Sequence, residues 1–205
     1  MDSGWLLLVY RVPTEPASKR VGIWRDLKRL GGLYLQQCVC IVPDRPALAA
    51  EFDRIAGKIV AGGGESTLFP VPLLPPDDAG RIVEAFRVQR NKEYAEIVEE
   101  CETKFIKEIA FEHFRQNYTF EETEEIGQDL EKIRRWFARI VERDWFAAAG
   151  REAVEGWIAR CQTLLDEFEQ EVYRRQGDGV DEAASAALPA LIPRPDMSTK
   201  VEDSR

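Results

Sequence analysis

The spacing of apolar residues over residues 5–43 constrains the fold more than any other feature of the sequence. Residues 5–12 (WLLLVYRV) form an apolar run that is too short for a full helix and rich in strand-forming residues. After this run, apolar side chains recur at helical spacing over 18–30, and a pair of glycines then stops the helix. Residues 33–42 alternate as a strand does. The pattern predicts a strand–helix–strand unit, which is half of a small α/β sandwich.

The rest of the first domain follows the same logic. Trp24 is counted in the apolar stripe of the first predicted helix, and basic side chains occupy most of the other faces of that helix. A second helix is expected over about 48–59, where apolar residues again recur at helical spacing. Residues 66–74 (STLFPVPLL) predict a strand, and its two prolines restrict it to the edge of a sheet.

Two prolines followed by two aspartates at 75–78 mark the clearest boundary in the sequence, because acidic residues favour the start of a helix. After this point no strand pattern returns, and apolar residues keep a helical period as far as about residue 176. Thr119 and Glu122 have the spacing of a capping box, which predicts a new helix there. The last two helices are joined by a short hinge at 147–150, so we expect an antiparallel hairpin.

These patterns predict an α+β protein with three parts. An α/β domain covers 5–76, and a helical domain covers 77–176. Residues 177–205 have low complexity and three prolines, which predicts a disordered tail.

The charge balance limits the possible partners. The formal net charge is -9, from 37 acidic and 28 basic side chains. A protein that wraps nucleic acid with its whole surface needs a positive footprint, so that class is disfavoured, whereas a local basic patch is compatible. No stretch approaches the roughly 20 apolar residues of a membrane span, and no secretory signal is recognisable. We therefore expect a cytoplasmic protein that does not engage a membrane.

Four cysteines fit a reducing compartment, because their spacing matches neither a disulfide framework nor a structural zinc site. Cys38 and Cys40 are expected on one strand face, either as small half-buried residues or as thiols open to oxidation. Cys101 and Cys161 lie in helical apolar stripes and are expected in the core. His113 is the single histidine, and the acidic residues around it do not have the spacing of a metal or catalytic site. No other cluster has such a spacing, so no cofactor is predicted.

Local basic residues are the candidates for nucleic-acid contact. On a duplex such side chains would bind phosphates without reading the sequence, and pairing with nearby glutamates is the alternative. The candidates are Arg25, Arg29, Arg87, Arg90, Arg134, Arg135 and Arg139.

Several segments together resemble one known family. They are WLLLVYRVP, WRDLKRLG and GLYLQQCVCIVP in the first domain and EYAEIVEECETKFIKEIAFEHFRQNYTFEETEEIGQDLEKIRRWF in the second. They are similar to the N-terminal domain of the chromate-resistance regulator ChrB over about residues 5–175. The resemblance implies a chromate-responsive regulatory protein of resistance operons, a homo-oligomer with DNA as a partner. Members of this family commonly carry a further C-terminal domain, whereas here the helical part is followed by the tail.

The resemblance gives the basic corner at the start of the first helix a meaning. Arg11, Lys19 and Arg20 lie around the turn into that helix, where backbone N–H groups and the helix dipole also favour an anion. Chromate is a tetrahedral dianion, so these three residues are the predicted oxyanion site, with solvated or ion-paired arginine as the alternative. Cys38 and Cys40 are the candidate thiols for oxidation by Cr(VI) or for binding a soft metal, and the favoured alternative is that they are small, half-buried strand residues.

A more distant similarity is to the ferredoxin-like CRISPR spacer-acquisition nucleases, which implies a ferredoxin-like βαββαβ order with the ribbon at 33–42 split into two strands. Those nucleases place an acidic metal ligand at the end of the first strand, and this position is Arg11 here. Because a guanidinium would repel a metal ion, we do not expect an enzyme. The alternatives are a non-catalytic protein interaction module and a degenerate metal-dependent nuclease.

Overall fold

The computed structural model describes residues 4–186, and the side chains of residues 4–176. Its first part is a four-stranded antiparallel sheet in the order β2-β3-β1-β4. The strands are β1 (Trp5–Arg11), β2 (Leu33–Gln36), β3 (Val39–Pro43) and β4 (Glu65–Val71). The predicted edge position of β4 is confirmed, since this strand pairs only with β1.

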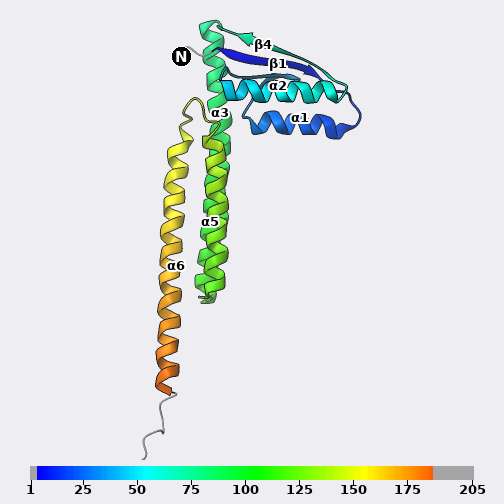
Figure 1. The fold of residues 1–205 in the computed structure, drawn as a ribbon. Coiled ribbons are helices and arrows are strands. Elements are labelled where there is room, and N and C mark those ends of the chain that lie inside the picture. The colour runs from blue at the N-terminus through cyan, green and yellow to red at the C-terminus, as the bar shows by residue number, and fades with distance from the viewer. Residues whose placement is uncertain (1–3, 187–205) are drawn as a thin grey trace, which may run out of the picture.

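Two helices, α1 (Ala17–Arg29) and α2 (Pro46–Ala61), cover one face of this sheet (Figure 1). The core between them contains Leu8, Leu27 and Phe52, each with no exposed surface. Burial of each such side chain contributes roughly 1.5–3 kcal/mol. The α+β class predicted from the sequence is thereby confirmed.

The ribbon at 33–42 is two strands joined by a tight turn. Cys38 lies in this turn with φ 62, a left-handed conformation that is uncommon for a residue with a side chain. The prediction that Cys38 and Cys40 share one strand face is therefore wrong, because only Cys40 belongs to a strand.

The opposite face of the sheet meets the start of the helical part. Trp5 stacks on Phe86 at 6.1 Å and on Phe146 at 5.8 Å between ring centroids, and Trp145 meets Phe86 edge to face at 5.5 Å. Such aromatic pairs add about 0.5–1.5 kcal/mol each beyond their buried area. This aromatic cluster fixes the sheet on top of the helices.

The helical part forms a stalk below the sheet (Figure 1). Its elements are α3 (Pro76–Glu100), a π-helical turn η1 (Cys101–Phe105), α4 (Ile106–Arg115), α5 (Phe120–Val141) and α6 (Gly150–Ala186). The predicted cap of α5 is confirmed, because the backbone N–H of Glu122 donates to Oγ1 of Thr119 at 3.2 Å. Cys101 and Cys161 are buried in the common core of the stalk, as predicted.

The last helix is longer than expected. α6 continues to Ala186 and so passes Gly177 and Gly179, where the sequence predicts its end. Of the predicted tail at 177–205, residues 187–205 lie outside the described part of the chain.

A buried ionic joint connects the sheet, α3 and the loop before α6. Arg90 is 1% exposed, and its Nη1 lies 3.0 Å from Oε2 of Glu93. Nη2 of Arg143 donates to the same oxygen at 2.8 Å. The Arg143 side chain also packs on Gly31, where an added Cβ would lie 2.9 Å from the Cβ of Arg143. Gly31 has φ +77, so both its conformation and this close approach require glycine.

Glu93→Gln should destabilise the protein strongly, because it leaves the buried Arg90 and the partly buried Arg143 without their shared carboxylate. We expect a loss on the order of 3 kcal/mol in the free energy of unfolding, measured in urea. Glu96→Gln is the matched control, since Glu96 is exposed one helical turn away on α3. Equal stability of the two variants would contradict the role given to the joint.

Candidate functional site

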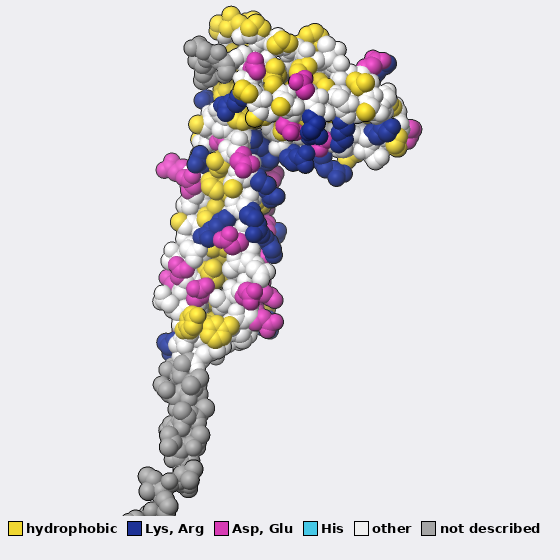
Figure 2. Space-filling view, in the orientation of Figure 1, with side chains coloured by type: hydrophobic (Ala, Val, Ile, Leu, Met, Phe, Trp, Pro, Cys, Tyr) yellow, Lys and Arg dark blue, Asp and Glu magenta, His cyan; other side chains and the backbone are white. Residues whose placement is uncertain are grey.

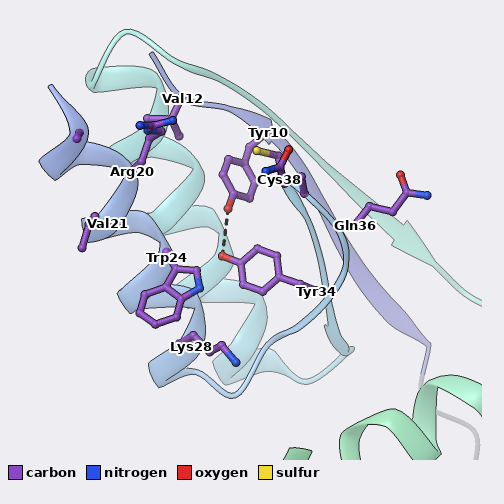
Figure 3. A pocket seen from close by; sticks show the side chains of 11 residues that line it. Tyr10, Val12, Arg20, Val21, Trp24, Lys28, Tyr34, Gln36 and Cys38 are labelled. Atoms are coloured by element: carbon purple, nitrogen blue, oxygen red, sulfur yellow. Dashed lines mark hydrogen bonds between the residues drawn. The ribbon is translucent and has the colours of Figure 1, made fainter. Parts of the chain in front are cut away.

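A groove lies between α1 and the ribbon of β2 and β3 (Figure 3). Its volume is about 800 Å³, which is within the range of pockets for small organic ligands. The lining combines aromatic, cationic and amide side chains. It comprises Tyr10, Val12, Ala17, Arg20, Val21, Trp24, Lys28, Tyr34, Gln36, Gln37 and Cys38.

One stripe of α1 forms the helical wall of this groove. Arg20, Trp24 and Lys28 are four residues apart, so they lie on the same side of the helix. Trp24 is 50% exposed, which is unusual for so large an apolar side chain. Neither the Arg20 side chain nor the Lys28 side chain makes a hydrogen bond or an ion pair with any of the described residues. Two cations on either side of an exposed indole are therefore free to bind an anion.

A pair of phenols faces this stripe from the sheet. The hydroxyl of Tyr10 lies 3.1 Å from the hydroxyl of Tyr34, and Figure 3 shows the two pointing toward each other. Burial raises the pKa of both phenols, so both are protonated at neutral pH. Because one hydroxyl donates to the other, the second proton is free to donate to a ligand.

The two neighbouring thiols have different environments. Cys38 lines the groove and is half-buried, whereas Cys40 has no exposed surface. Burial raises the pKa of the Cys40 thiol to about 12. Since the thiolate is the reactive form, Cys40 is the less reactive of the two.

The three residues of the predicted oxyanion corner do not lie in one pocket. Arg11 follows Tyr10 on β1 and so points to the other face of the sheet, where it forms an ion pair with Glu65 of β4. Nζ of Lys19 donates to the backbone carbonyl of Gly62 at 3.1 Å. Only Arg20 lines the groove.

The predicted nucleic-acid residues fall into three groups. The prediction that Arg90 contacts nucleic acid is wrong, because Arg90 is 1% exposed and belongs to the buried joint. Arg29, Arg87 and Arg134 are tied to neighbours within the protein, namely to Asp26, to the backbone carbonyl of Phe146, and to Glu131 and Gln162 respectively. The third group is exposed and has no ion pair with any described residue. It consists of Arg25, Arg135 and Arg139.

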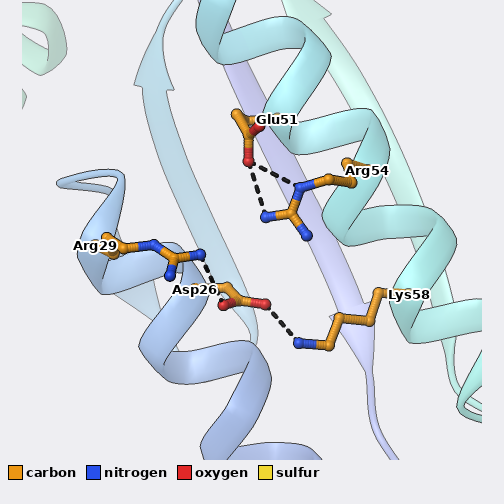
Figure 4. A network of polar contacts seen from close by, with 5 residues as sticks. All are labelled: Asp26, Arg29, Glu51, Arg54 and Lys58. Carbon is orange, nitrogen blue, oxygen red and sulfur yellow. Dashed lines mark hydrogen bonds and ion pairs between the residues drawn. The ribbon is translucent and has the colours of Figure 1, made fainter.

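Ion pairs also neutralise much of the outer surface of α1 and α2. Asp26 accepts from Arg29 at 3.2 Å and from Lys58 at 2.6 Å, and Arg54 pairs with Glu51 (Figure 4). These exposed pairs contribute little stability, about 0–1 kcal/mol each. Among the described residues, the basic side chains of α1 without an ion pair are Lys19, which donates to the carbonyl of Gly62, Arg25, and the groove cations Arg20 and Lys28.

Sequence reasoning missed most of the groove. Trp24 was expected in the buried stripe, and this prediction is wrong, because α1 buries Ile23 and Leu27 and turns the indole toward the groove. Tyr10, Tyr34 and Lys28 were not singled out. The available signal was the strand alternation, which places Tyr10 two residues from the buried Leu8 on the same face.

Two further findings concern the described residues. Among the side chains of residues 4–176 no group of three or more His, Cys, Asp or Glu is arranged to hold a metal ion. Within residues 4–186, every helix is too short or too polar to cross a bilayer.

The thiols give a direct test of the groove. Iodoacetamide applied to the native protein should label Cys38 and spare Cys40, whose raised pKa and complete burial both suppress reaction. Peptide mass spectrometry reads the sites, and labelling in denaturant, which should reach all four cysteines, is the control. Native labelling of Cys40 at the rate of Cys38 would contradict this geometry.

The comparisons with known proteins agree with one family. A sequence model of the family described as "Protein ChrB, N-terminal" matches residues 20–179. Protein ChrB of Cupriavidus metallidurans is 30% identical over 95 residues, which is 46% of this chain and 29% of that protein. The match thus spans less than a third of that relative. No solved structure matches. Since the family model covers most of the sequence, the chain belongs to the family of the N-terminal part of protein ChrB.

Proposed function

We propose that this chain is a chromate-responsive regulatory protein of the ChrB type, which acts in the cytoplasm and binds a tetrahedral oxyanion in the groove of α1. Membership of the ChrB family supports the link to chromate resistance. The observation that carries the oxyanion site is the groove itself, where Arg20 and Lys28 lack partners among the described residues and lie opposite two protonated phenols.

The chemistry of these groups suits an oxyanion. A dianion needs both positive charge and hydrogen-bond donors, and cation-to-oxyanion bonds are roughly twice as strong as neutral ones. Arg20 and Lys28 supply the charge, and the free phenol proton supplies a neutral donor. The proposed site therefore differs from the oxyanion corner predicted from the sequence, which was Arg11, Lys19 and Arg20. Of these three residues, the proposed site retains Arg20.

Nucleic acid is the proposed macromolecular partner. Figure 2 shows Lys and Arg side chains gathered on the α1 side of the sheet and on the adjoining part of the stalk. Arg25, Arg135 and Arg139 are exposed and have no ion pair with described residues, so they can bind phosphates without first breaking an existing pair. This surface gives affinity without reading the base sequence.

We assign the first part to the ferredoxin-like type and the pair α5 and α6 to an antiparallel hairpin. The element order β1-α1-β2-β3-α2-β4 and the strand order β4-β1-β3-β2 support the first assignment. Extensive packing of α5 on α6 supports the second. A homo-oligomer is also proposed, because Val9 and Phe69 remain 37% and 47% exposed on the face of the sheet that is opposite α1 and α2.

A second candidate function is a protein interaction module. Aromatic side chains are exposed where α4, α5 and α6 meet at the far end of the stalk, with Phe114 at 85% and Tyr173 at 66%. A module of this kind would bind its partner without responding to chromate. We do not propose enzymatic activity.

Lys28→Ala and Arg20→Ala should each weaken chromate binding by about 10-fold, the loss expected when one charge-assisted hydrogen bond of about 1.4 kcal/mol is removed. Equilibrium dialysis measures the affinity, and sulfate serves as a tetrahedral dianion that does not oxidise thiols. Lys107→Ala is the control, since Lys107 is exposed on α4 and has no partner among the described residues. Unchanged affinity in both groove variants would remove the oxyanion site.

Arg135→Ala combined with Arg139→Ala should weaken binding to duplex DNA of any sequence and lower its salt dependence by about 2 in the slope of log K against log salt. A gel shift at several salt concentrations, with and without chromate, measures both. DNA affinity that is the same with and without chromate would favour the interaction module instead.

A further inference from the structure

The groove of α1 is larger and more aromatic than a small oxyanion requires. Its volume is about 800 Å³, and its α1 wall carries the half-exposed indole of Trp24, on which no side-chain cation among the described residues is stacked. A tetrahedral anion can use the cations and the phenol proton but gains nothing from a flat aromatic surface. The indole therefore points to a ligand that also carries a ring.

We propose that the groove binds a nucleotide unit, with the base stacked on Trp24 and the phosphates on Arg20 and Lys28. This inference rests on the proposed function, because it assigns the same cations to a second anion. Sites that hold single strands combine a positive groove with aromatic side chains on which bases stack, and this groove has both features.

The spacing along α1 supports this assignment. Arg20 and Lys28 are separated by eight residues, which is about 12 Å along the helix axis at about 1.5 Å per residue. Trp24 lies midway between them on the same side of the helix. A base stacked on the indole would thus have one cation on each side of it along the axis of α1. One free nucleotide would use one cation, and a single strand would use both.

The sheet side of the groove supplies groups for the edge of a base. Gln37 lines it in the turn that follows β2, and its side chain carries an amide donor and an amide acceptor. This amide makes no hydrogen bond with a described residue. Gln36 also lines the groove, but Figure 3 shows its side chain directed away from α1. The Tyr10–Tyr34 pair adds one free hydroxyl proton on the sheet side. An unstacked base can therefore be bound by its face and its edge together.

This arrangement couples the two anions by competition. Chromate bound at Arg20 and Lys28 takes the charges that the phosphates of a nucleic-acid strand require, so the two ligands exclude each other. Each lowers the apparent affinity of the other by a factor set by its own concentration relative to its own dissociation constant. The regulatory consequence is release of a strand from the groove when chromate is bound. No movement of the backbone is required.

The test uses the full chain and a fluorescein-labelled single-stranded oligothymidylate, with fluorescence anisotropy as the measurement. Trp24→Ala should weaken binding by about 10-fold or more, and Trp24→Phe should restore part of the loss because it keeps an aromatic face. Phe114→Ala is the control, since Phe114 is an aromatic residue at 85% exposure on another helix. Arg20→Ala and Lys28→Ala should each reduce the salt slope by about 0.7.

Three further arms identify the ligand. Thymidine monophosphate that displaces the oligonucleotide shows that a free nucleotide occupies the groove, and failure to displace it assigns the groove to a strand; both outcomes support the proposal. Displacement by neutral thymidine at equal concentration would overturn it, because the cations would then play no part. Trp24→Ala protein that binds the oligonucleotide as tightly as the parent would also overturn it.

The outcome separates this inference from the proposed function. Chromate and sulfate should displace the oligonucleotide from the parent protein. If the oligonucleotide binds through Trp24 and chromate does not bind, the proposed function falls and the nucleotide site remains. If chromate binds and the Trp24→Ala substitution does not change the affinity for the oligonucleotide, the nucleotide site is refuted and the proposed function is retained.

Discussion

The packing of α1 on the sheet is the contact on which the rest of the structure depends. Ile23 and Leu27 are buried against the sheet, and Leu27 has no exposed surface. The chain can return so tightly after α1 only because residue 32 is glycine, where an added Cβ would lie 2.5 Å from Sγ of Cys40. Once these contacts are fixed, the helix has no freedom to rotate. Arg20, Trp24 and Lys28 then face the ribbon of β2 and β3, which closes the groove.

The turn after α1 also contacts the stalk, so the position of the groove relative to the stalk is fixed. Gly31 comes after the C-cap residue of α1, Leu30, and packs on the side chain of Arg143, whose guanidinium pairs with Glu93 of α3. Arg90 approaches the same carboxylate from within the core, and burial lowers the pKa of its guanidinium. Removing a buried charge from water costs several kcal/mol, so such a joint holds only when its partners are all in place. It therefore fixes the orientation of the sheet relative to the stalk.

The sequence predicts elements better than it predicts the site. The strands and helices could be found because each signal depends on residues that are close together in the sequence. These signals are the helical spacing of apolar residues, the prolines at the end of β4 and the cap at Thr119. The split of the ribbon at Cys38 could not be found from the residue pattern, because a left-handed turn at a residue other than glycine carries no compositional mark, and it was implied only by the distant resemblance to the ferredoxin-like nucleases. Arg90 was misplaced for a related reason: a charged residue is assigned to the surface unless its buried partner is known.

The groove escaped prediction because it is assembled from segments that are distant in sequence. Tyr10 and Tyr34 meet across 24 residues, and only the strand order places them opposite α1. Trp24 fits the helical period of the buried stripe, yet the sheet is filled by Ile23 and Leu27, and the indole is left at the edge.

An acidic chain can still attract an anion, because what acts at short range is the local balance of charge. The formal net charge is -9, and many of the basic side chains on α1 and α2 are already paired with acids. Beyond about 10 Å, salt screens the acidic surface, while the cations at the groove wall act at contact distance. Arg20 and Lys28 form no ion pair with a carboxylate of the described residues, so their positive charge is available to an anion.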